Sequence, residues 1–375
     1  MSKYETNLTL IIPTYNRSDW LSCTLKTIAN FNLKILVMDG STSKEHIEKN
    51  HKLIEQINHK NGDHLVTHIV SEDSFFERVH NAVNIANTEF CKICADDDLF
   101  SIEFISDAIN KLKRNKKIAS VVGVSASYDL LGRKFLGFTD QYHKGMASSD
   151  LFLRGTALSR RSGFFGVMPI KLLRLCSLLS VEAEKFILKD EDNDNSTWAA
   201  YRLMELIYRT TVICTGIVEK SDNLMLLRLY HEDNLGGKLA KKNRHLDYFL
   251  NKDIVIFLEI LCTRISFELD IPVENVRTVI FYDHFSDLSN RFEVIKNEIR
   301  LSIKSSEQFN VLNNQSFCDS KSIARLLSFI LRSLRQVIDR KEVVGIDKNQ
   351  VKREADKIIN EFLAFYDSLS NNSLY

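Results

Sequence analysis

The sequence predicts an α/β protein in which a mostly parallel, twisted sheet is flanked by helices and followed by an all-α C-terminal region. In the first 130 residues, short apolar segments alternate with longer stretches of helical spacing. This alternation is typical of βαβ units, whose strands run parallel. After about residue 240, one helical pattern follows another. The 375 residues are enough for one or two domains.

Short apolar segments within the first 130 residues predict five strands. They are Leu8–Ile12, Leu33–Met38, Leu65–Val70, Phe90–Cys94 and Val121–Ser125. Pro13 is expected to stop the first strand, because proline has no N–H to donate to a neighbouring strand.

Apolar residues three or four positions apart predict helices between these strands. They cover Asp19–Asn30 with Ser18 as N-cap, Lys44–Lys60, Phe75–Ala86 and Ser101–Leu112.

Beyond residue 130 the pattern is less regular. Gly132–Gly166 mixes glycine, serine and aromatic residues and is expected to be rich in loops. Helices are predicted at Lys171–Lys189 and, with Ser196 as N-cap, at Thr197–Arg209; strands are predicted at Val212–Cys214 and Leu224–Leu229.

The C-terminal third is predicted to be helical. The expected helices are Asp253–Phe267, Val273–Ile299, Ser322–Arg340 and Gln350–Ser368. We therefore expect an α/β part over residues 1–240, with halves 1–130 and 131–240, and a helical region over 241–375.

Composition excludes several classes of protein. The formal net charge is +1, which argues against a nucleic-acid partner. No apolar run is long enough to span a bilayer, and the N-terminus has no signal-peptide core. The 7 cysteines lack the spacing of a disulfide framework, so we expect free thiols and a cytoplasmic protein.

Asp96, Asp97 and Asp98 directly follow the predicted strand Phe90–Cys94. Three unpaired carboxylates inside a core would be very costly, so the strand is expected to end there, at its carboxyl edge. Ligands bind at that edge of open α/β sheets. Clustered carboxylates suit Mg²⁺ or Mn²⁺, which often share their ligand shell with substrate phosphates. The alternative is a solvated cap of the helix that begins near Ser101.

Four segments resemble, in order, the motifs of family 2 glycosyltransferases with the GT-A fold. They are Leu10–Arg17 at the opening strand, Val37–Ser41 at the second strand end, His80–Phe90 leading into the DXD motif, and Asp96–Asp98 as that motif. The resemblance covers residues 7–130 well, residues 196–235 loosely and the C-terminal tail not at all.

The resemblance implies a nucleotide site at the first loop. Pro13 and Thr14 would lie against the base, Tyr15 would stack on it, and Arg17 would contact a phosphate. Arg78, on the helix before the acids, would also contact phosphate. For both arginines, an ordinary helix-surface position is the alternative.

The resemblance also assigns roles to four acids. Asp39 would accept a hydrogen bond from the base N–H, which favours uracil; its alternative is a turn residue before Gly40. Asp96 would contact the ribose or a metal-bound water, with Asp97 beside it. Asp98 would bind the Mn²⁺ or Mg²⁺ that bridges the two phosphates.

An inverting transfer needs a carboxylate that takes the proton of the acceptor hydroxyl. By its order in the family pattern, Glu205 would be this base, although the usual acidic pair appears here as Glu205-Leu206. Asp192 and Asp194, in the preceding acidic segment, are the competing candidates.

A short strand closed by a histidine follows the base in the family pattern. His231 matches that histidine and would complete the metal shell; a surface position at the strand end is the alternative. Arg228 would pair with the diphosphate.

The resemblance thus implies a metal-dependent, inverting transfer from a nucleotide sugar, with a UDP-sugar favoured, to a glycan or lipid-linked acceptor in bacterial surface polysaccharide synthesis. Residues 1–130 would be the nucleotide-binding half and 131–240 the acceptor half. The alternatives are a sugar nucleotidyltransferase, which typically has a Gly-rich, basic first loop, and a non-catalytic nucleotide-sugar-binding protein.

The segment Ser322–Ile338 has the pattern of a basic amphipathic helix. It would either lie on the inner face of a membrane, near a lipid-linked acceptor, or pack within its domain or in a homodimer.

Overall fold

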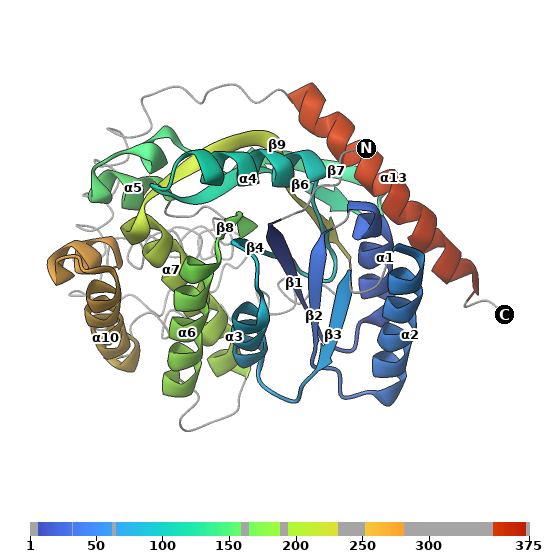
Figure 1. The fold of residues 1–375 in the computed structure, drawn as a ribbon, viewed down its shortest axis with the longest axis horizontal. Helices are drawn as coiled ribbons and strands as arrows, with labels where there is room; N and C mark the ends of the chain where they lie inside the picture. The colour runs from blue at the N-terminus through green and yellow to red at the C-terminus, as the bar shows by residue number, and fades with distance from the viewer. Residues whose placement is uncertain are drawn as a thin grey trace, which may run out of the picture.

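The computed structural model describes residues 7–31, 33–61, 65–158, 165–187, 194–231, 252–280 and 348–372. Two sheets form the centre of this part of the chain, and helices surround them (Figure 1). Their strand orders are β3-β2-β1-β4-β8 and β5-β9-β6-β7. A bridge between Val121 and Val167 links the two sheets. The predicted α/β class, with a sheet rich in parallel strands, is confirmed.

The first sheet contains the first four predicted strands. β1 (Leu8–Thr14), β2 (Lys34–Asp39), β3 (Val66–Val70) and β4 (Phe90–Ile93) are parallel, and β8 (Met168–Pro169) is antiparallel to β4. The chain runs from β1 through β2 to β3 on one side and returns to β4 on the other side of β1. The carboxyl ends of β1 and β4 therefore flank the switch point at which open α/β sheets bind ligands.

Pro13 does not end β1, contrary to the prediction. The pairing with β4 stops at Ile11↔Ile93, whereas the pairing with β2 continues to Thr14↔Asp39. The proline thus lies beyond the last pair with β4, where the missing N–H costs no ladder hydrogen bond.

Helices cover both faces of this sheet. α1 (Ser18–Ile28) and α2 (Lys44–Asn61) lie on one face, and α3 (Phe75–Ile85) and α6 (Ile170–Ile187) lie on the other (Figure 1). The Ser74 hydroxyl accepts a hydrogen bond from the Glu77 amide and so caps α3. In the same way Ser101 caps α4 (Ile102–Arg114), directly after the three acids.

The second sheet is built on two long strands, β6 (Ile118–Asp129) and β9 (Ile217–Tyr230), which run parallel. β7 (Lys134–Asp140) pairs antiparallel with β6, and the two-residue strand β5 (Asp98–Leu99) pairs antiparallel with β9. The expected loop region Gly132–Gly166 thus includes β7. It also includes the short helices η2 (Lys144–Ala147) and α5 (Leu151–Leu158).

The predicted strand Val212–Cys214 is wrong, because these residues complete helix α7 (Asp194–Thr215). All three are buried on that helix. The hydroxyls of Thr211 and Thr215 donate to the carbonyls of Ile207 and Thr211, each at 2.7 Å, so both are satisfied within the helix. Burial of the apolar side chains outweighs the strand preference of β-branched residues.

In the described part of the C-terminal third (252–280 and 348–372), two long helices form, α10 (Lys252–Leu269) and α13 (Lys348–Asn372), with a helical stretch over 273–280. α10 packs on α6 and α7. α13 lies far from α10 and packs against α1 and β9 (Figure 1). The buried face of α13 belongs to the same hydrophobic core as the two sheets. The predicted basic helix Ser322–Ile338 lies outside the described residues, and the domain boundary near residue 240 stays a prediction.

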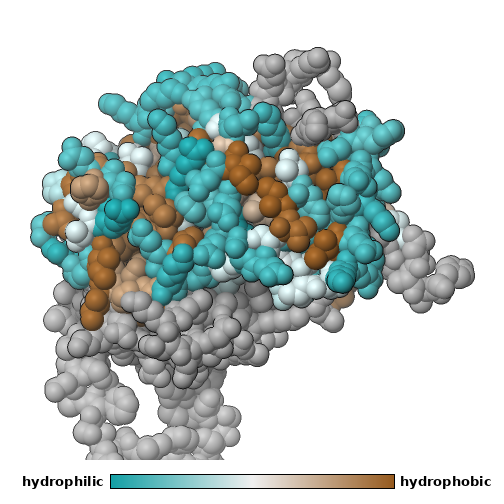
Figure 2. Space-filling view, turned by 60° about the horizontal axis from the view of Figure 1, so that its bottom comes forward, coloured by the Kyte–Doolittle hydropathy of each residue, from teal (hydrophilic) through white to brown (hydrophobic). Residues whose placement is uncertain are grey.

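The face shown in Figure 2 is largely hydrophilic, with apolar patches between the polar side chains. Among the described helices, none combines the length and the apolar character that a transmembrane span requires.

We expect Glu354→Ala to lower the free energy of unfolding by about 1–3 kcal/mol, because it leaves a buried amide without an acceptor. The carboxylate of Glu354 on α13 accepts a hydrogen bond of 2.8 Å from the amide of Leu224, a fully buried residue of β9. Urea unfolding would measure the loss, with exposed Lys357→Ala on the same helix as the control. Equal stability of the two variants would contradict the prediction.

Candidate active site

The three consecutive acids lie at the switch point between β1 and β4, as predicted. Asp96 and Asp97 form the turn after β4, and Asp98 begins β5. They are not solvated: their relative exposures are 3%, 6% and 5%. The alternative of a solvated helix cap is therefore wrong, and their charges must be balanced within the protein or by a ligand.

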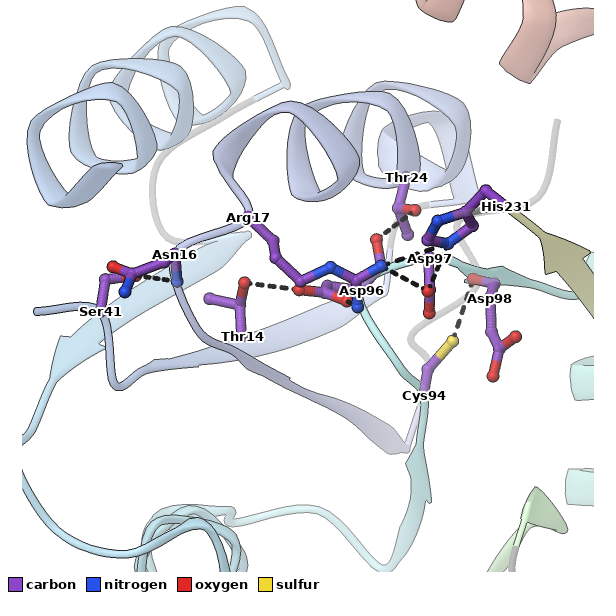
Figure 3. Close-up of polar contacts among 10 residues, drawn as sticks. All are labelled: Thr14, Asn16, Arg17, Thr24, Ser41, Cys94, Asp96, Asp97, Asp98 and His231. Carbon is purple, nitrogen blue, oxygen red and sulfur yellow. Dashed lines mark hydrogen bonds and ion pairs between the residues drawn. The ribbon is translucent and has the colours of Figure 1, made fainter. Parts of the chain in front are cut away.

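Asp96 is held by the loop and helix that follow β1 (Figure 3). Its carboxylate accepts hydrogen bonds of 2.7 Å from Thr14 Oγ1 and of 2.7 Å from Arg17 Nη1. Its backbone carbonyl accepts a third, of 2.8 Å, from Thr24 Oγ1 on α1. The end of β4 is thereby tied to the end of β1.

Asp97 joins the same arginine to the end of β9. Its Oδ2 lies 2.5 Å from Arg17 Nη2 and 2.9 Å from His231 Nε2, and the two nitrogens are 3.2 Å apart. The side chain of His231 is 4% exposed. Asp96, Asp97 and His231 thus converge on one guanidinium group (Figure 3).

Asp98 faces a different environment. In Figure 3 its carboxylate points away from the imidazole of His231. Its backbone pairs with Arg228, and its carbonyl accepts a hydrogen bond from the Cys94 thiol at 3.3 Å. The cations that act on its charge are Arg228 and buried Lys92. The structure therefore brings His231 together with Asp97, and not with Asp98 as the sequence led us to expect.

The three acids are all buried, but their different polar contacts separate their pKa values. Burial and the charge of Asp97 raise the pKa of Asp98 to about 7. Burial also raises the pKa of Asp96 to about 7, against the opposing charge of Arg17. For Asp97, hydrogen bonds from His231 and Arg17 outweigh burial and lower the pKa.

The chemistry of these side chains fits a divalent cation. Two carboxylates and an imidazole already surround one positive charge, and Mn²⁺ accepts oxygen and imidazole ligands. Among the described residues, no three acidic, histidine or cysteine side chains form a ready-made metal site. A bound cation would need Arg17 to give up part of its contacts with Asp96 and Asp97.

The loop after β1 is fixed by Asn16. This residue has a left-handed φ of 52°, which asparagine tolerates better than most residues. Its side-chain oxygen accepts hydrogen bonds from the amides of Thr42 and Ser43, each at 3.1 Å, ahead of α2. Next to it, the ring of Tyr15 is 52% exposed. The loop therefore presents Tyr15 outward on a rigid base.

Asp39, at the end of β2, is completely buried. It accepts hydrogen bonds from the Ser41 amide at 2.8 Å, from Asn50 at 2.7 Å and from His68 at 3.0 Å. Burial opposes ionisation, but these donors together hold its pKa well below the usual range. Asp39 is thus a charged structural centre that joins β2, β3 and α2.

Arg78 on α3 lies beside this centre. Its guanidinium donates to the carbonyl of Asp73 at 2.9 Å, while its buried Nε has no hydrogen-bond partner in the described part of the chain. A Cβ atom on Gly40 would lie 1.7 Å from Arg78 Nη1, so any larger residue there would displace the guanidinium from its present position. Burial lowers the pKa of Arg78, and Asp39 and Tyr15 are among the groups that oppose this shift.

Glu205 lies midway along α7. Its carboxylate is 43% exposed and 3.7 Å from Arg209. Asp192 lies outside the described residues, and for Asp194 only the backbone, at the start of α7, is described. Arg228 lies in β9 with its guanidinium carbon 5.8 Å from the ring of Phe165. The choice of catalytic base stays a prediction.

Four side chains of this region were missed at the level of sequence. Thr24 and Asn50 lie in helices, where the spacing of apolar residues shows only which face of the helix is buried. Lys92 lies within the otherwise apolar strand β4. Trp20 reads as a core residue of α1, yet its ring stacks on His231 with centroids 3.8 Å apart. The only local signal is a polar or aromatic residue at a position that helix or strand periodicity would turn toward the protein interior.

The sequence was compared with protein-family models. Residues 9–174 match the model described as glycosyl transferase family 2. This match includes β1 to β4, the three acids and Arg78. Residues 9–174 are a family 2 glycosyltransferase domain. The resemblance of the motifs is thereby confirmed, whereas His231, Glu205 and α13 lie beyond the matched segment.

A search of curated proteins found no match. Among solved structures, S. aureus TarS aligns at 15% identity and a TM-score of 0.45, covering 74% of this chain and 43% of that one. TarS 1–349 in complex with UDP-GlcNAc aligns at 14% identity and a TM-score of 0.45, covering 74% of this chain and 72% of that one. The mannosyltransferase PcManGT of Pyrobaculum calidifontis, in complex with GDP-Man and Mn²⁺, aligns at 12% identity and 0.41, covering 90% and 89%.

The raised pKa of Asp98 predicts how the stability of this glycosyltransferase domain depends on pH when EDTA is present. A carboxylate with a folded pKa of about 7 stabilises the fold below its unfolded pKa of about 4 and loses this contribution as pH rises through 7. Between pH 5 and 7, the free energy of unfolding should fall relative to Asp98→Asn by up to about 1.4 kcal/mol per pH unit.

Urea unfolding at pH 5, 6, 7 and 8 would test this expectation. Asp222→Asn, which changes an exposed carboxylate of β9, is the matched control. Its free energy of unfolding should depend on pH in the same way as that of the unmodified chain. If the free energy of unfolding of Asp98→Asn shows the same pH dependence as that of the unmodified chain, the pKa of Asp98 is not raised.

Proposed function

We propose that the chain is a metal-dependent, inverting glycosyltransferase that moves a sugar from a nucleotide sugar, preferably a UDP-sugar, to a hydroxyl of a glycan or lipid-linked acceptor. The observation that carries the proposal is the convergence of Asp96, Asp97 and His231 on one positively charged group, the guanidinium of Arg17. This convergence lies at the switch point of a family 2 domain. A role in bacterial surface polysaccharide synthesis, at the inner face of the membrane, is part of this proposal.

Asp97 and His231 would hold Mn²⁺ or Mg²⁺ together with Asp98, whose carboxylate would have to turn toward them, and Asp96 would lie toward the ribose or a metal-bound water. When bound, the ion would stabilise the charge that develops on the departing diphosphate. Arg17, at the start of α1, would then give up part of its contacts with the acids and bind a phosphate oxygen instead.

The nucleotide would lie over the loop after β1, where the exposed ring of Tyr15 offers a stacking surface. Pro13 and Thr14 shape the floor of this loop, since both belong to β1 and Thr14 is bound to Asp96. Arg78 would lie beside the nucleotide, because its guanidinium packs on Gly40 and its Nε lacks a partner.

Asp39 would contribute to base recognition indirectly. It has no exposed surface, and three donors already bind its carboxylate, so a base could reach it only if His68 or Asn50 moved. Its negative charge instead acts electrostatically on Arg78, and its hydrogen bond from the Ser41 amide fixes the segment that follows β2. The preference for uracil stays a prediction.

A panel of nucleotide sugars would test the function. With Mn²⁺, we expect slow release of UDP from one UDP-sugar, loss of release with EDTA, and recovery on adding Mn²⁺. Asp98→Ala should abolish turnover and keep the fold, whereas Asp222→Asn should keep turnover. Release that survives EDTA would contradict the metal role, and pyrophosphate formed from UTP and a sugar phosphate would indicate a nucleotidyltransferase.

The general base is tested separately. Glu205→Gln should lower kcat by about 100-fold or more, as expected on losing proton transfer, with little change in donor affinity. Single-turnover transfer and donor titration would measure the two quantities. If kcat is unchanged, the same assay on Asp192→Asn and Asp194→Asn would move the role to one of those residues.

A further inference from the structure

His231 is buried, but one of its ring nitrogens is not hydrogen-bonded. Nε2 faces Asp97 and Arg17, whereas Nδ1 is inaccessible and has no hydrogen-bond partner among the residues that the structure describes. A histidine that binds a metal is normally oriented by a hydrogen bond from its second nitrogen, and losing that bond typically weakens metal binding 10- to 100-fold. Another contact must therefore fix the plane of this ring.

The indole of Trp20 makes that contact. The two rings are stacked, with centroids 3.8 Å apart and planes inclined by 22°. Trp20 is in the first turn of α1, three residues after Arg17, whose guanidinium lies 5.8 Å from the same ring. The indole thus borders both groups that bind Asp97.

The indole of Trp20 also lies beside an aromatic ring of the C-terminal helix. Phe362 of α13 is completely buried, and its ring lies nearly parallel to the indole, with centroids 6.3 Å apart and an angle of 15°. α13 is held at both ends: Glu354 binds the amide of Leu224 in β9, and Asp367 pairs with Arg133 at 2.7 Å. These two contacts and the burial of Phe362 itself hold its ring beside the indole.

We propose that Trp20 and Phe362 are positioning residues for the cation site, and that α13 is required to orient His231 for its ligand. This inference rests on the proposed function. It assigns a role at the donor site to a helix that follows the matched family segment by more than 170 residues. The aromatic stack replaces the hydrogen bond that Nδ1 lacks.

Mn²⁺ affinity, measured on the full chain by the electron paramagnetic resonance of free Mn²⁺, with and without UDP, tests this role without requiring turnover. Phe362→Leu and Trp20→Leu should weaken Mn²⁺ binding about 10-fold or more, because they remove the stacked ring. Phe362→Tyr and Trp20→Phe, which keep an aromatic ring, should stay within about 3-fold of the unmodified chain. Ile358→Val, a buried change one turn away on α13, is the matched control and should have no effect.

A double-mutant cycle separates positioning from general packing. In a His231→Ala background, Trp20→Leu should cause no further loss, because the ring that it positions is gone. In a Trp198→Phe background, Trp20 is the only tryptophan, so its emission reports whether the stack persists in each folded variant.

The outcomes are distinct. Equal losses in Phe362→Leu and Ile358→Val, or a loss from Trp20→Leu that persists without His231, would overturn the inference and leave the proposed function intact. An unmodified chain that binds no Mn²⁺, even with UDP, would instead refute the proposed function, and the inference would fall with it.

Discussion

Two adjacent buried carboxylates, Asp96 and Asp97, depend on the forked guanidinium of Arg17. In a medium of low polarity, like charges on neighbouring residues repel strongly, and each loses its hydration. Arg17 places one terminal nitrogen on each carboxylate, at 2.7 and 2.5 Å, which is the geometry that a planar guanidinium favours. Because Arg17 follows β1 and the acids follow β4, this one contact also closes the switch point of the sheet. The carboxyl ends of the two strands are thereby held as a single site.

The remaining contacts make that site rigid before any ligand binds. Asn16 ties the first loop to the start of α2, and Asp39 ties β2 to β3 and α2 through three hydrogen bonds. Gly40 leaves the space that the guanidinium of Arg78 fills. Rigid placement of polar groups lowers the cost of organising a site on binding. The exposed ring of Tyr15, on this loop, is accessible to a ligand without any rearrangement.

Local pattern predicted much of the first half of the chain. Four parallel strands and the helices between them follow directly from apolar periodicity, and the acids lie at the strand end because a core does not accept them unpaired. The same reasoning failed where local preference and burial disagree, as at Val212–Cys214, whose β-branched residues complete a buried helix. It also missed β7, because glycine and polar residues in that segment hide the alternation of a strand.

The order of motifs along the chain determined the family, the position of the acids and the residue types available for a cation site, since each depends on neighbours within a few positions. Tertiary structure alone decided which of these residues meet. His231 contacts Asp97 and not Asp98, and the ring of Trp20 that stacks on it lies beside the ring of Phe362, 342 positions further along the chain. Such contacts depend on how β9 and α13 pack against α1, and no periodicity within a segment encodes the partner of its buried face.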